Sequence, residues 1–485
     1  MNLAPERTEL APGLTISRVL TGLWQIADME RDGRALKLEA AASAMTPYVA
    51  AGLTTFDMAD HYGSAEDIAG FFVARYGAGP GPELLTKWVP KPGPVSREHV
   101  RTAVTRSLER LQAETIALLQ FHAWSYSDPR WLDCLFWLQE LKREGLIRQL
   151  GLTNFDTAHL RIAVRSGIEV VSNQVCFSLV DRRPLVGMTG LCEELGVKLL
   201  AYGTLAGGFL SERWLGKPEP DWDRLETWSQ MKYGRFIRAA GGWDALQGVL
   251  RAAAGVARRQ GVSLAAVACR YVLEQPAVAG VIVGARLGER EHIADTLRVF
   301  EFHLEDEDRA ELDAAGARLR PIPGDCGDEY RKPPYLTASG DLSPHIETVP
   351  PPYDVRPGPG RSLVLSGTPW ETIAGYCRAT RAGGRILVSG TTATHGDRLV
   401  GGADPAAQTH FIIDKIAGAI ESLGGRLDHV VRTRVYVRNV ADWEPVARAH
   451  GARFAGILPA NTLVQAQLIG DEYLVEIEAE AVVPG

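Results

Sequence analysis

The stretch Phe56-Asp57-Met58-Ala59-Asp60-His61-Tyr62-Gly63-Ser64-Ala65-Glu66 decides the fold and the site of this 485-residue chain. Leu53 to Phe56 is apolar or β-branched, which is typical of a buried strand. Asp57 then ends the strand, and Tyr62 stands on the loop that follows. In a barrel of parallel strands, catalytic side chains gather at that end of the strands. The pattern predicts that Asp57 and Tyr62 share a cleft, although alone it also fits a helix cap beside a packed aromatic residue.

The composition is ordinary for a folded globular protein, with 46% hydrophobic and 23% charged residues. A net charge of -7 without any Lys/Arg run argues against a nucleic-acid-binding surface or a polybasic membrane contact. Met1 to Leu14 lacks the apolar core of a signal peptide, and no run of about 18 apolar residues follows. We therefore expect a cytoplasmic protein with small-molecule partners, and neither nucleic acid nor membrane among them.

The cysteines are scattered along the chain without a C-x2-C pair, which is typical of reduced thiols. They are Cys134, Cys176, Cys192, Cys269, Cys326 and Cys377. We interpret all of them as structural and predict no metal site.

Between Ser17 and Arg286, short apolar runs alternate with amphipathic segments at roughly thirty-residue steps. The predicted strands are Val19 to Gly22, Leu53 to Phe56, Leu84 to Thr86, Ile116 to Phe121, Gln149 to Leu152, Val170 to Ser172, Lys198 to Ala201 and Gly280 to Val283. The predicted helices include Arg97 to Leu111, Trp131 to Glu144, Thr157 to Ser166 and Leu264 to Leu273, with Ser96 and Ser263 as N-caps. Eight such βα units predict an α/β protein with a closed (β/α)8 TIM barrel. A doubly wound open sheet is the alternative, but Gly22-Leu23-Trp24-Gln25 stands where a G-x-G-x-x-G would be expected.

The composition changes after the barrel. Glu305 to Glu311 opens a helix that ends near Leu319, and the Pro/Gly-rich stretch from Pro321 to Gly360 predicts an extended tail and linker without helix. Beyond it, the patterns predict a second, smaller α+β domain. Its strands are Gly384 to Gly390, Val430 to Val437 and Tyr473 to Val483, and its helices are Gln408 to Leu423 and Trp443 to Phe454. We therefore expect a barrel with its tail over 1–345, a linker over 346–361 and the second domain over 362–485.

Two more polar residues follow predicted strands in the way that Asp57 does. Lys87 follows Leu84 to Thr86, and His122 follows Ile116 to Phe121. Singly, a lysine there is usually a solvated rim residue and a histidine is usually satisfied in the core. Together with Asp57 and Tyr62, they place a carboxylate, a phenol, an ammonium and an imidazole at one end of the barrel.

This set suits carbonyl reduction. A tyrosine is a poor acid at neutral pH, but a neighbouring ammonium such as Lys87 favours the phenolate form. Asp57 can keep Lys87 charged and oriented, and His122 can hydrogen-bond the substrate oxygen as negative charge builds there. The hydride must come from a nicotinamide cofactor.

Residues 1 to about 320 resemble the aldo-keto reductase superfamily, through F-D-x-A-D-x-Y-G, L-L-T-K and L-L-Q-F-H. The resemblance implies that Asp57, Tyr62, Lys87 and His122 are the catalytic tetrad, with Tyr62 as proton donor. It also implies cofactor contacts. Thr153, Asn154 and Gln174 match the residues that hold the carboxamide, Tyr202 matches the aromatic residue that stacks on the nicotinamide ring, and Trp24 matches a lid residue. The remaining implied cofactor-binding residues are Gly22, Asp57, Gly203, Leu205, Gly284, Arg286 and Arg290.

The resemblance further implies NADP(H) as cofactor. Val281 to Arg286 is similar to the final strand and loop that grip the adenosine 2'-phosphate, and a guanidinium suits a phosphate by charge and geometry. His292 and Thr296 stand where many relatives carry Arg and Asn. Use of NAD(H) therefore stays open.

Residues 362 to 485 resemble the reactive-intermediate deaminase (Rid, YjgF-like) family, which implies a chorismate-mutase-like fold. The matching segments are Gly375-Tyr376-Cys377-Arg378-Ala379, Val388 to Thr392, Gln408-Thr409, Asp428 to Val437 and Val475 to Ala479. The implied pocket contains Tyr376, Asn461 and Glu476, but Asn461 stands where deaminating members have the arginine that binds a carboxylate. The departure argues against imine deamination. The family's trimers imply a homotrimer, with a monomeric appendage as the alternative.

The sequence thus predicts an NADP(H)-dependent reductase of aldehydes or ketones, or a dehydrogenase of the matching alcohols or sugars. The alternative is a nicotinamide-binding redox sensor or scaffold with little turnover. A third hypothesis is that one domain forms an imine or carbonyl that the other consumes. The loops Trp124 to Asp128, Gly207 to Gly242 and Gly324 to Ser343 are expected around the substrate. Their aromatic residues Trp124, Tyr126, Trp214 and Trp222 predict either an apolar wall or surface packing.

Overall fold

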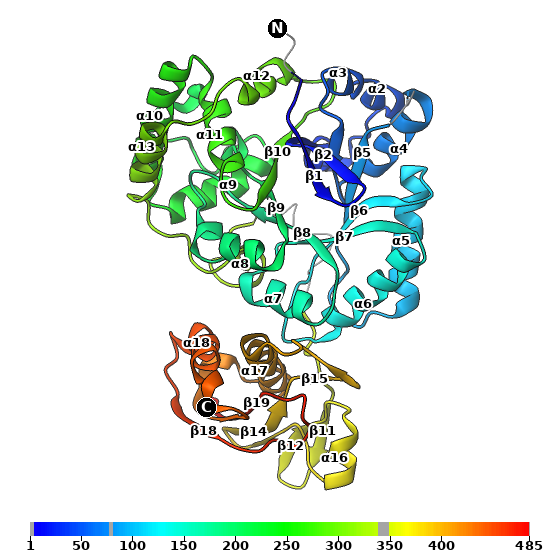
Figure 1. The fold of residues 1–485 in the computed structure, drawn as a ribbon, viewed down its shortest axis with the longest axis vertical. Coiled ribbons are helices and arrows are strands. Elements are labelled where there is room, and N and C mark those ends of the chain that lie inside the picture. The colour runs from blue at the N-terminus through cyan, green and yellow to red at the C-terminus, as the bar shows by residue number, and fades with distance from the viewer. Residues whose placement is uncertain (1–3, 77–80, 338–348, 485) are drawn as a thin grey trace.

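The computed structural model describes residues 4–76, 81–337 and 349–484. Within these residues, parallel strands close into a barrel in the order β10-β3-β4-β5-β6-β7-β8-β9 (Figure 1). Their bounds are β3 (Val19–Gly22), β4 (Thr55–Asp57), β5 (Glu83–Trp88), β6 (Ile116–Phe121), β7 (Ile147–Thr153), β8 (Val170–Cys176), β9 (Lys198–Tyr202) and β10 (Val278–Gly284). The predicted (β/α)8 barrel is confirmed.

A hairpin of β1 (Arg7–Ala11) and β2 (Leu14–Ser17) closes one end of this barrel. Leu10, Leu14 and Ile16 from the hairpin pack against Leu85 and Leu118 from inside the barrel. The apolar plug fills the end at which the strands begin. Side chains at the ends of the strands therefore face the other, open end, where the predicted catalytic residues lie.

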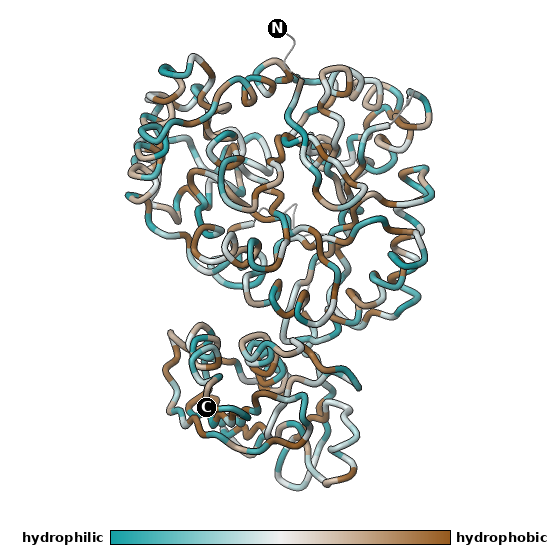
Figure 2. Tube along the Cα trace, in the orientation of Figure 1, coloured by the Kyte–Doolittle hydropathy of each residue, from teal (hydrophilic) through white to brown (hydrophobic). Residues whose placement is uncertain are grey.

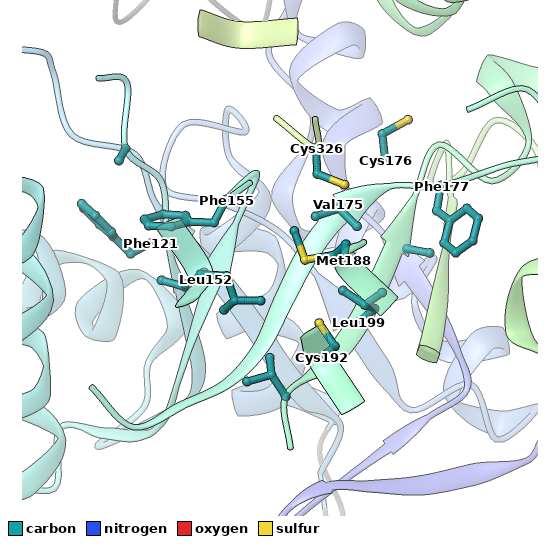
Figure 3. Packing of buried hydrophobic residues seen from close by; sticks show 14 of the residues in the cluster. Phe121, Leu152, Phe155, Val175, Cys176, Phe177, Met188, Cys192, Leu199 and Cys326 are labelled. Carbon is teal, nitrogen blue, oxygen red and sulfur yellow. The ribbon is translucent and has the colours of Figure 1, made fainter. Parts of the chain in front are cut away.

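Helices surround the barrel, and their tubes alternate between hydrophilic and hydrophobic residues, as expected for helices with one buried face (Figure 2). Buried side chains such as Phe121, Leu152, Phe155 and Met188 fill the space between strands and helices (Figure 3). Ser96 and Ser263 accept hydrogen bonds from His99 N and Ala266 N, so both predicted N-caps are confirmed. The helices are α1 (Trp24–Met29), α2 (Leu38–Ser43), α3 (Thr46–Ala50), α4 (Ala65–Tyr76), α5 (Arg97–Leu111), α6 (Arg130–Arg143), α7 (Thr157–Arg165), α8 (Met188–Leu195), α9 (Trp228–Ala239), α10 (Trp243–Gln260), α11 (Leu264–Leu273), α12 (Ile293–Leu297) and α13 (Asp306–Gly316).

The prediction that Pro321 to Gly360 contains no helix is wrong, because α14 (Asp328–Arg331) lies there. Long-range contacts stabilise this single turn: Glu329 forms an ion pair with Arg183, and Arg331 donates to the backbone oxygens of Ala123 and Asn154. Such tertiary contacts override a composition that disfavours helix. Residues 338–348 of the predicted tail and linker lie outside the described residues.

The second domain contains a seven-stranded sheet in the order β11-β12-β13-β14-β19-β17-β18. Strands β14, β17 and β19 and helices α17 and α18 match the prediction, whereas the others were not predicted. The strands are β11 (Val355–Gly358), β12 (Arg361–Val364), β13 (Ala379–Ala382), β14 (Arg385–Thr392), β17 (Val430–Val437), β18 (Ala460–Gln465) and β19 (Val475–Val482). A separate hairpin consists of β15 (Thr394–His395) and β16 (Arg398–Leu399), and the helices are α16 (Pro369–Ala374), α17 (Pro405–Ser422) and α18 (Trp443–Phe454).

Two features of this domain extend beyond the expected boundaries. Strand β11 lies inside the stretch 346–361 that was predicted as a linker, and it pairs antiparallel with β12, so the sheet begins at Val355. Helix α17, which packs against β14 and β19, also packs on α7 of the barrel (Figure 1). The two domains therefore share a contact between helices far apart in the chain.

Candidate active site

A cavity of about 620 Å³ opens at the end of the barrel where the strands finish. Asp57, Tyr62, Lys87 and His122 all line it, and so do the predicted cofactor-binding residues. Those are Gly22, Trp24, Thr153, Asn154, Gln174, Tyr202, Gly203, Leu205, Gly284, Arg286 and Arg290. The volume is in the range of cofactor and small-ligand sites. One cavity thus joins groups from strands that are far apart in sequence.

Lys87 is buried and forms an ion pair with Asp57. Its Nζ lies 2.6 Å from Asp57 Oδ2, donates to Met58 O at 2.8 Å, and is 4.9 Å from the centroid of the Tyr62 ring. Burial lowers the pKa of Lys87 below its ordinary value, and the Asp57 carboxylate opposes this shift. A cation is therefore held beside the phenol by a carboxylate, as the sequence predicted.

Two glutamines complete the surroundings of Asp57. Gln174 Nε2 donates to Asp57 Oδ1 at 2.8 Å, and Gln120 Nε2 lies 3.2 Å from the same oxygen. Gln174 also donates to Gln120 Oε1 at 2.9 Å. Gln120 was not predicted, although a glutamine in the apolar run Leu118 to Phe121 was a signal for a side chain inside the barrel. The glutamines fix the carboxylate that orients Lys87.

Aromatic rings surround His122. Its ring centroid lies 4.3 Å from that of Trp124 and 5.4 Å from that of Tyr330, both edge to face. Tyr330 comes from α14, so the tail of the barrel domain covers the imidazole. The sequence placed the segment Gly324 to Ser343 near the substrate, but it did not single out Tyr330.

Lys232 on α9 brings a second ammonium to the cavity. Its Nζ donates to Tyr330 Oη at 2.6 Å and lies 5.0 Å from the centroid of the Tyr202 ring. Glu329, next to Tyr330, forms an ion pair with Arg183 at 2.8 Å, which fastens α14 to the barrel. Burial opposes ionisation of Glu329, yet Arg183 and Lys232 hold its pKa below the ordinary value. The roof of the cavity is thus polar and ionised.

The residues predicted to contact nicotinamide lie together. Tyr202 Oη is 2.8 Å from Asn154 Oδ1, and Thr153 Oγ1 donates to Gln174 O at 3.3 Å. Asn154 has a φ of 59°, a left-handed conformation that turns the chain at the end of β7. Gln25 Oε1 also lines the cavity, and among the described residues it has no hydrogen-bond partner. These amide and hydroxyl groups fit a carboxamide-bearing cofactor.

At the predicted phosphate end, Arg286 is already paired. Its guanidinium lies 2.8 Å from Asp28 Oδ2 and 2.9 Å from Glu289 Oε2. Arg290 and His292 line the same cavity. The carboxylates partly neutralise Arg286, which the sequence did not predict.

The predicted aromatic wall is only partly correct. Trp124 and Trp214 line the cavity, whereas Tyr126 and Trp222 do not. Tyr126 instead stacks on His159, with ring centroids 3.4 Å apart, and Trp222 packs against Phe209. These two side chains are structural because each meets a ring brought close by the fold.

The predicted residues of the second domain divide into two places. Tyr376 and Glu476 lie near Arg378, which donates to Tyr376 Oη at 3.1 Å. Burial raises the pKa of Glu476 above its ordinary value, and Arg378 opposes part of this shift. Arg378 also donates to the Gly390 backbone oxygen, so it supports the fold. Asn461 stands on the edge strand β18 and donates to Thr433 Oγ1 at 2.9 Å.

Comparisons with known proteins agree with this fold. Residues 18–317 match the family model described as the aldo/keto reductase family, and residues 368–483 match the model described as Endoribonuclease L-PSP. The barrel and its site define an oxidoreductase of carbonyl or alcohol groups that uses a nicotinamide cofactor. The chain belongs to the aldo/keto reductase family, and it carries a second domain of the YjgF-like kind.

Several relatives are similar to separate parts of the chain. Protein tas of Escherichia coli is 29% identical over 318 residues, which are 57% of this chain and 89% of that protein. An uncharacterized protein of Streptomyces coelicolor is 41% identical over 119 residues, which are 24% of this chain and 89% of that protein. The structure of a glycerol dehydrogenase from Gluconobacter oxydans, 24% identical, aligns with a TM-score of 0.54 over 64% of this chain and 95% of that chain. This last likeness shows a shared fold.

Among the helices of the described residues, none is both long enough and apolar enough to cross a membrane.

Proposed function

We propose that the chain is an NADP(H)-dependent reductase of aldehydes or ketones, with oxidation of the matching alcohols or sugars as the reverse reaction. The observation that carries the proposal is the position of the Lys87 ammonium. It lies 2.6 Å from Asp57 and 4.9 Å from the Tyr62 ring, in one cavity with His122. These groups can protonate and polarise a carbonyl oxygen.

Tyr62 gives its proton to the substrate oxygen as the carbonyl becomes an alcohol. The Lys87 charge favours the phenolate that remains, and Asp57 keeps Lys87 oriented. His122 hydrogen-bonds the same substrate oxygen while negative charge develops on it. Thr153, Asn154, Gln174 and Tyr202 would hold a nicotinamide, which would supply the hydride. Rings of Trp124 and Tyr330 beside His122 restrict water at the reacting carbonyl.

The preference for NADP(H) rests on Arg286 and Arg290 at the far part of the cavity. Asp28 and Glu289 reduce the net charge beside Arg286, which supports retained use of NAD(H). A carboxylate near an adenosine ribose is the usual partner of the 2'-hydroxyl of NAD. We therefore propose that the chain uses both cofactors and prefers NADP(H).

The test is Tyr62→Phe, with Tyr48→Phe as a matched control, because Tyr48 is a buried tyrosine outside the cavity. We expect Tyr62→Phe to lose at least about 100-fold in kcat for carbonyl reduction. NADPH affinity, measured by quenching of tryptophan fluorescence, should stay within about twofold of the wild type, because Tyr62 is not among the carboxamide-binding groups.

Two outcomes contradict the proposal. If Tyr62→Phe turns over about as fast as Tyr48→Phe, Tyr62 is not the proton donor. A wild type that binds NADPH but reduces no member of a broad aldehyde and ketone panel supports the redox sensor or scaffold instead.

We also propose that the second domain assembles the chain into a homotrimer and binds a small ligand without deaminating imines. Asn461 offers a neutral amide on an edge strand, and a carboxylate binds such a group less strongly than a guanidinium. Arg434 and Glu478 form an ion pair at 2.9 Å across the partly exposed face of β17 and β19. The side chains of Arg434 and Glu478 are 40% and 35% exposed, and a partly exposed face of this kind suits self-association.

Sedimentation of the full-length chain tests the trimer, since a single species of monomer mass contradicts it. Hydrolysis of 2-aminoacrylate-type imines tests the second statement. We expect at most background rates for the wild type and for Asn461→Ala alike. Fast hydrolysis that Tyr376→Phe abolishes shows instead that the domain is a deaminase.

A further inference from the structure

A buried cluster of charged residues joins the two domains. His159 on α7 lies between two carboxylates: Nδ1 is 2.5 Å from Asp156 Oδ1, and Nε2 is 2.8 Å from Asp414 Oδ2 on α17. Asp156, His159 and Asp414 are 5%, 3% and 1% exposed, so water does not screen these contacts. Arg453 on α18 lies 2.7 Å from Asp414 Oδ1. The barrel and the second domain therefore meet through an ionised triad of Asp156, His159 and Asp414.

Both ring nitrogens of His159 face carboxylates, which accept hydrogen bonds and cannot donate when ionised. A neutral imidazole has a single N–H, so only the imidazolium satisfies both neighbours. Burial lowers the pKa of His159, but Asp156 and Asp414 outweigh it and raise that pKa above its ordinary value. Burial and Arg453 lower the pKa of the adjacent His410 to about 4, so His410 is neutral there.

The other charged groups around His159 come from several elements. Asp325 and Lys332 interact electrostatically with Asp156, and Asp328 interacts electrostatically with Arg453. Arg331, beside them, lies over the Tyr126 ring that stacks on His159. Within this group, His159 is the histidine that contacts a carboxylate of each domain.

The triad is adjacent to the segment predicted to hold the nicotinamide carboxamide. Asp156 caps α7 through His159 N, only two residues after Asn154. Tyr126 stacks on His159 with an interplanar angle of 7°, and its Oη lies 3.5 Å from Asn154 O. Arg331 donates to the same oxygen at 2.7 Å.

The segment needs such support because of its conformation. Asn154 is left-handed, with a φ of 59°, and non-glycine residues keep this conformation only where neighbours over-determine it. Phe155 is fully buried, between the rings of Tyr126 and Trp131, and Figure 3 shows it next to Phe121 and Leu152. A shift of α7 thus moves the cap, the ring stack and Asn154 together.

We propose that His159 is a positioning residue, through which Asp414 of the second domain sets the conformation of Thr153, Asn154 and Phe155 and thereby the affinity of the barrel for its nicotinamide cofactor. The cofactor part of this inference rests on the proposed function. The second domain is then a structural part of the reductase site. Because coupling between two sites is reciprocal, cofactor binding also stabilises the contact between α7 and α17.

The first test compares full-length His159→Gln and Asp414→Asn with His395→Gln. His395 Nε2 lies 2.8 Å from Asp133 Oδ2, so it also pairs across the two domains, but between β15 and α6. We expect the dissociation constant for NADPH to rise about fivefold in the first two variants and less than twofold in His395→Gln. Equal effects in all three variants, or none, overturn the proposal.

The pH dependence separates positioning from general destabilisation. The wild-type affinity for NADPH should weaken as the pH rises through the raised pKa of His159, because the imidazolium that bridges the carboxylates is lost. In His159→Gln this step should disappear, while it persists in His395→Gln. A step of unchanged size in His159→Gln contradicts the proposal.

The second test needs no cofactor. Amide hydrogen exchange in residues 153–158 of the unliganded protein should be at least about threefold faster in His159→Gln and Asp414→Asn than in the wild type or His395→Gln. Asp414→Glu, which keeps the carboxylate, should restore part of the protection. Unchanged exchange in this segment refutes the inference, whether or not the chain binds a nicotinamide. Failure to bind a nicotinamide would separately refute the proposed function. If a variant fails to fold, Asp414→Glu is compared with Asp414→Gln instead. The measurement is again amide hydrogen exchange in residues 153–158.

Discussion

Lys232 Nζ lies 2.6 Å from Tyr330 Oη, and this pair connects helix α9 to the tail helix α14 above the catalytic cavity. Tyr330 in turn lies edge to face with His122. Lys232 is 5% exposed, and its ammonium lies 4.8 to 5.9 Å from the ring centroids of Tyr202, Tyr233 and Tyr330. This second cation and phenol line the same cavity as the cation and phenol of Lys87 and Tyr62.

This arrangement predicts a preference for carbonyl substrates with a second, anionic oxygen. Lys232→Met should lower kcat/KM for pyruvate about tenfold, because a charge-assisted hydrogen bond in a water-poor site is lost. For methyl pyruvate, which has the same carbonyl without the charge, the loss should stay below about threefold. Equal losses for the two compounds show that Lys232 only supports the roof. Steady-state kinetics with matched concentrations of NADPH measure both values.

The ion pairs of Arg286 predict how the choice of cofactor can be changed. Glu289→Gln removes a carboxylate 2.9 Å from the guanidinium, which should raise the preference for NADPH over NADH about threefold, as expected for a partly exposed pair. Arg286→Ala should weaken NADPH about tenfold and NADH little, since only the former carries the 2'-phosphate. Arg224→Ala, which changes an exposed arginine that does not line the cavity, is the control. The measurement is the dissociation constant of each variant for NADPH and for NADH. Equal changes for the two cofactors would show that the 2'-phosphate binds elsewhere.

Much of this architecture could be predicted because it depends on local pattern. Apolar runs ending in Asp57, Lys87 and His122 indicate both the strands and the end at which the side chains gather. Tyr330 and His159 could not be assigned their positions in this way. Each acts through residues more than 90 positions away in the chain, such as Lys232 for Tyr330 and Asp414 for His159, and such contacts leave no periodic signal.

The second domain shows the same limit. Strand β19 alternates buried and partly exposed residues and was predicted, but β18 is exposed along most of its length and shows no such alternation. Its residues form a strand because they pair with β17, from Arg432 opposite Ala460 to Val437 opposite Gln465. Pairing partners of this kind are set by the tertiary fold rather than by local preference.

The charged triad predicts that the contact between the domains depends on pH in both directions. The pKa of His159 is raised in the folded state, so its contribution to stability is complete below about pH 6.5 and is lost as the pH rises through the raised value. Asp414 has a lowered pKa despite its burial, which by itself raises it, because Arg453 and His159 favour the carboxylate. Its contribution is complete above about pH 3.9 and is lost as the pH falls through the lowered value.

The contact should therefore be most stable between about pH 4 and 6.5. The difference in Tm between wild type and Asp414→Asn, measured by calorimetry across this range and beyond it, should be largest inside the window and shrink on either side. The same difference for His395→Gln is the reference for an interdomain pair that lacks the second carboxylate. A difference for Asp414→Asn that does not vary from pH 4 to pH 10 contradicts an imidazolium between ionised carboxylates.

Gly327 predicts how closely α14 must approach the cofactor segment. It has a φ of 79°, and a Cβ at this position would overlap the backbone oxygen of Asn154. Gly327→Ala should therefore displace either α14 or Asn154, with a backbone strain of about 1 to 3 kcal/mol in the unmoved structure. Since Tyr330 and Arg331 move with α14, we expect both a weaker affinity for NADPH and a higher KM for the carbonyl substrate. Gly190→Ala, a glycine of α8 whose added Cβ meets nothing within 4 Å, should leave both unchanged. Gly327→Ala could instead raise the KM and leave the dissociation constant for NADPH as in the wild type. That result would mean that α14 moves alone and that the contacts of β7 and α7 hold Asn154. The contact of Arg331 with Asn154 would then not be needed for cofactor binding.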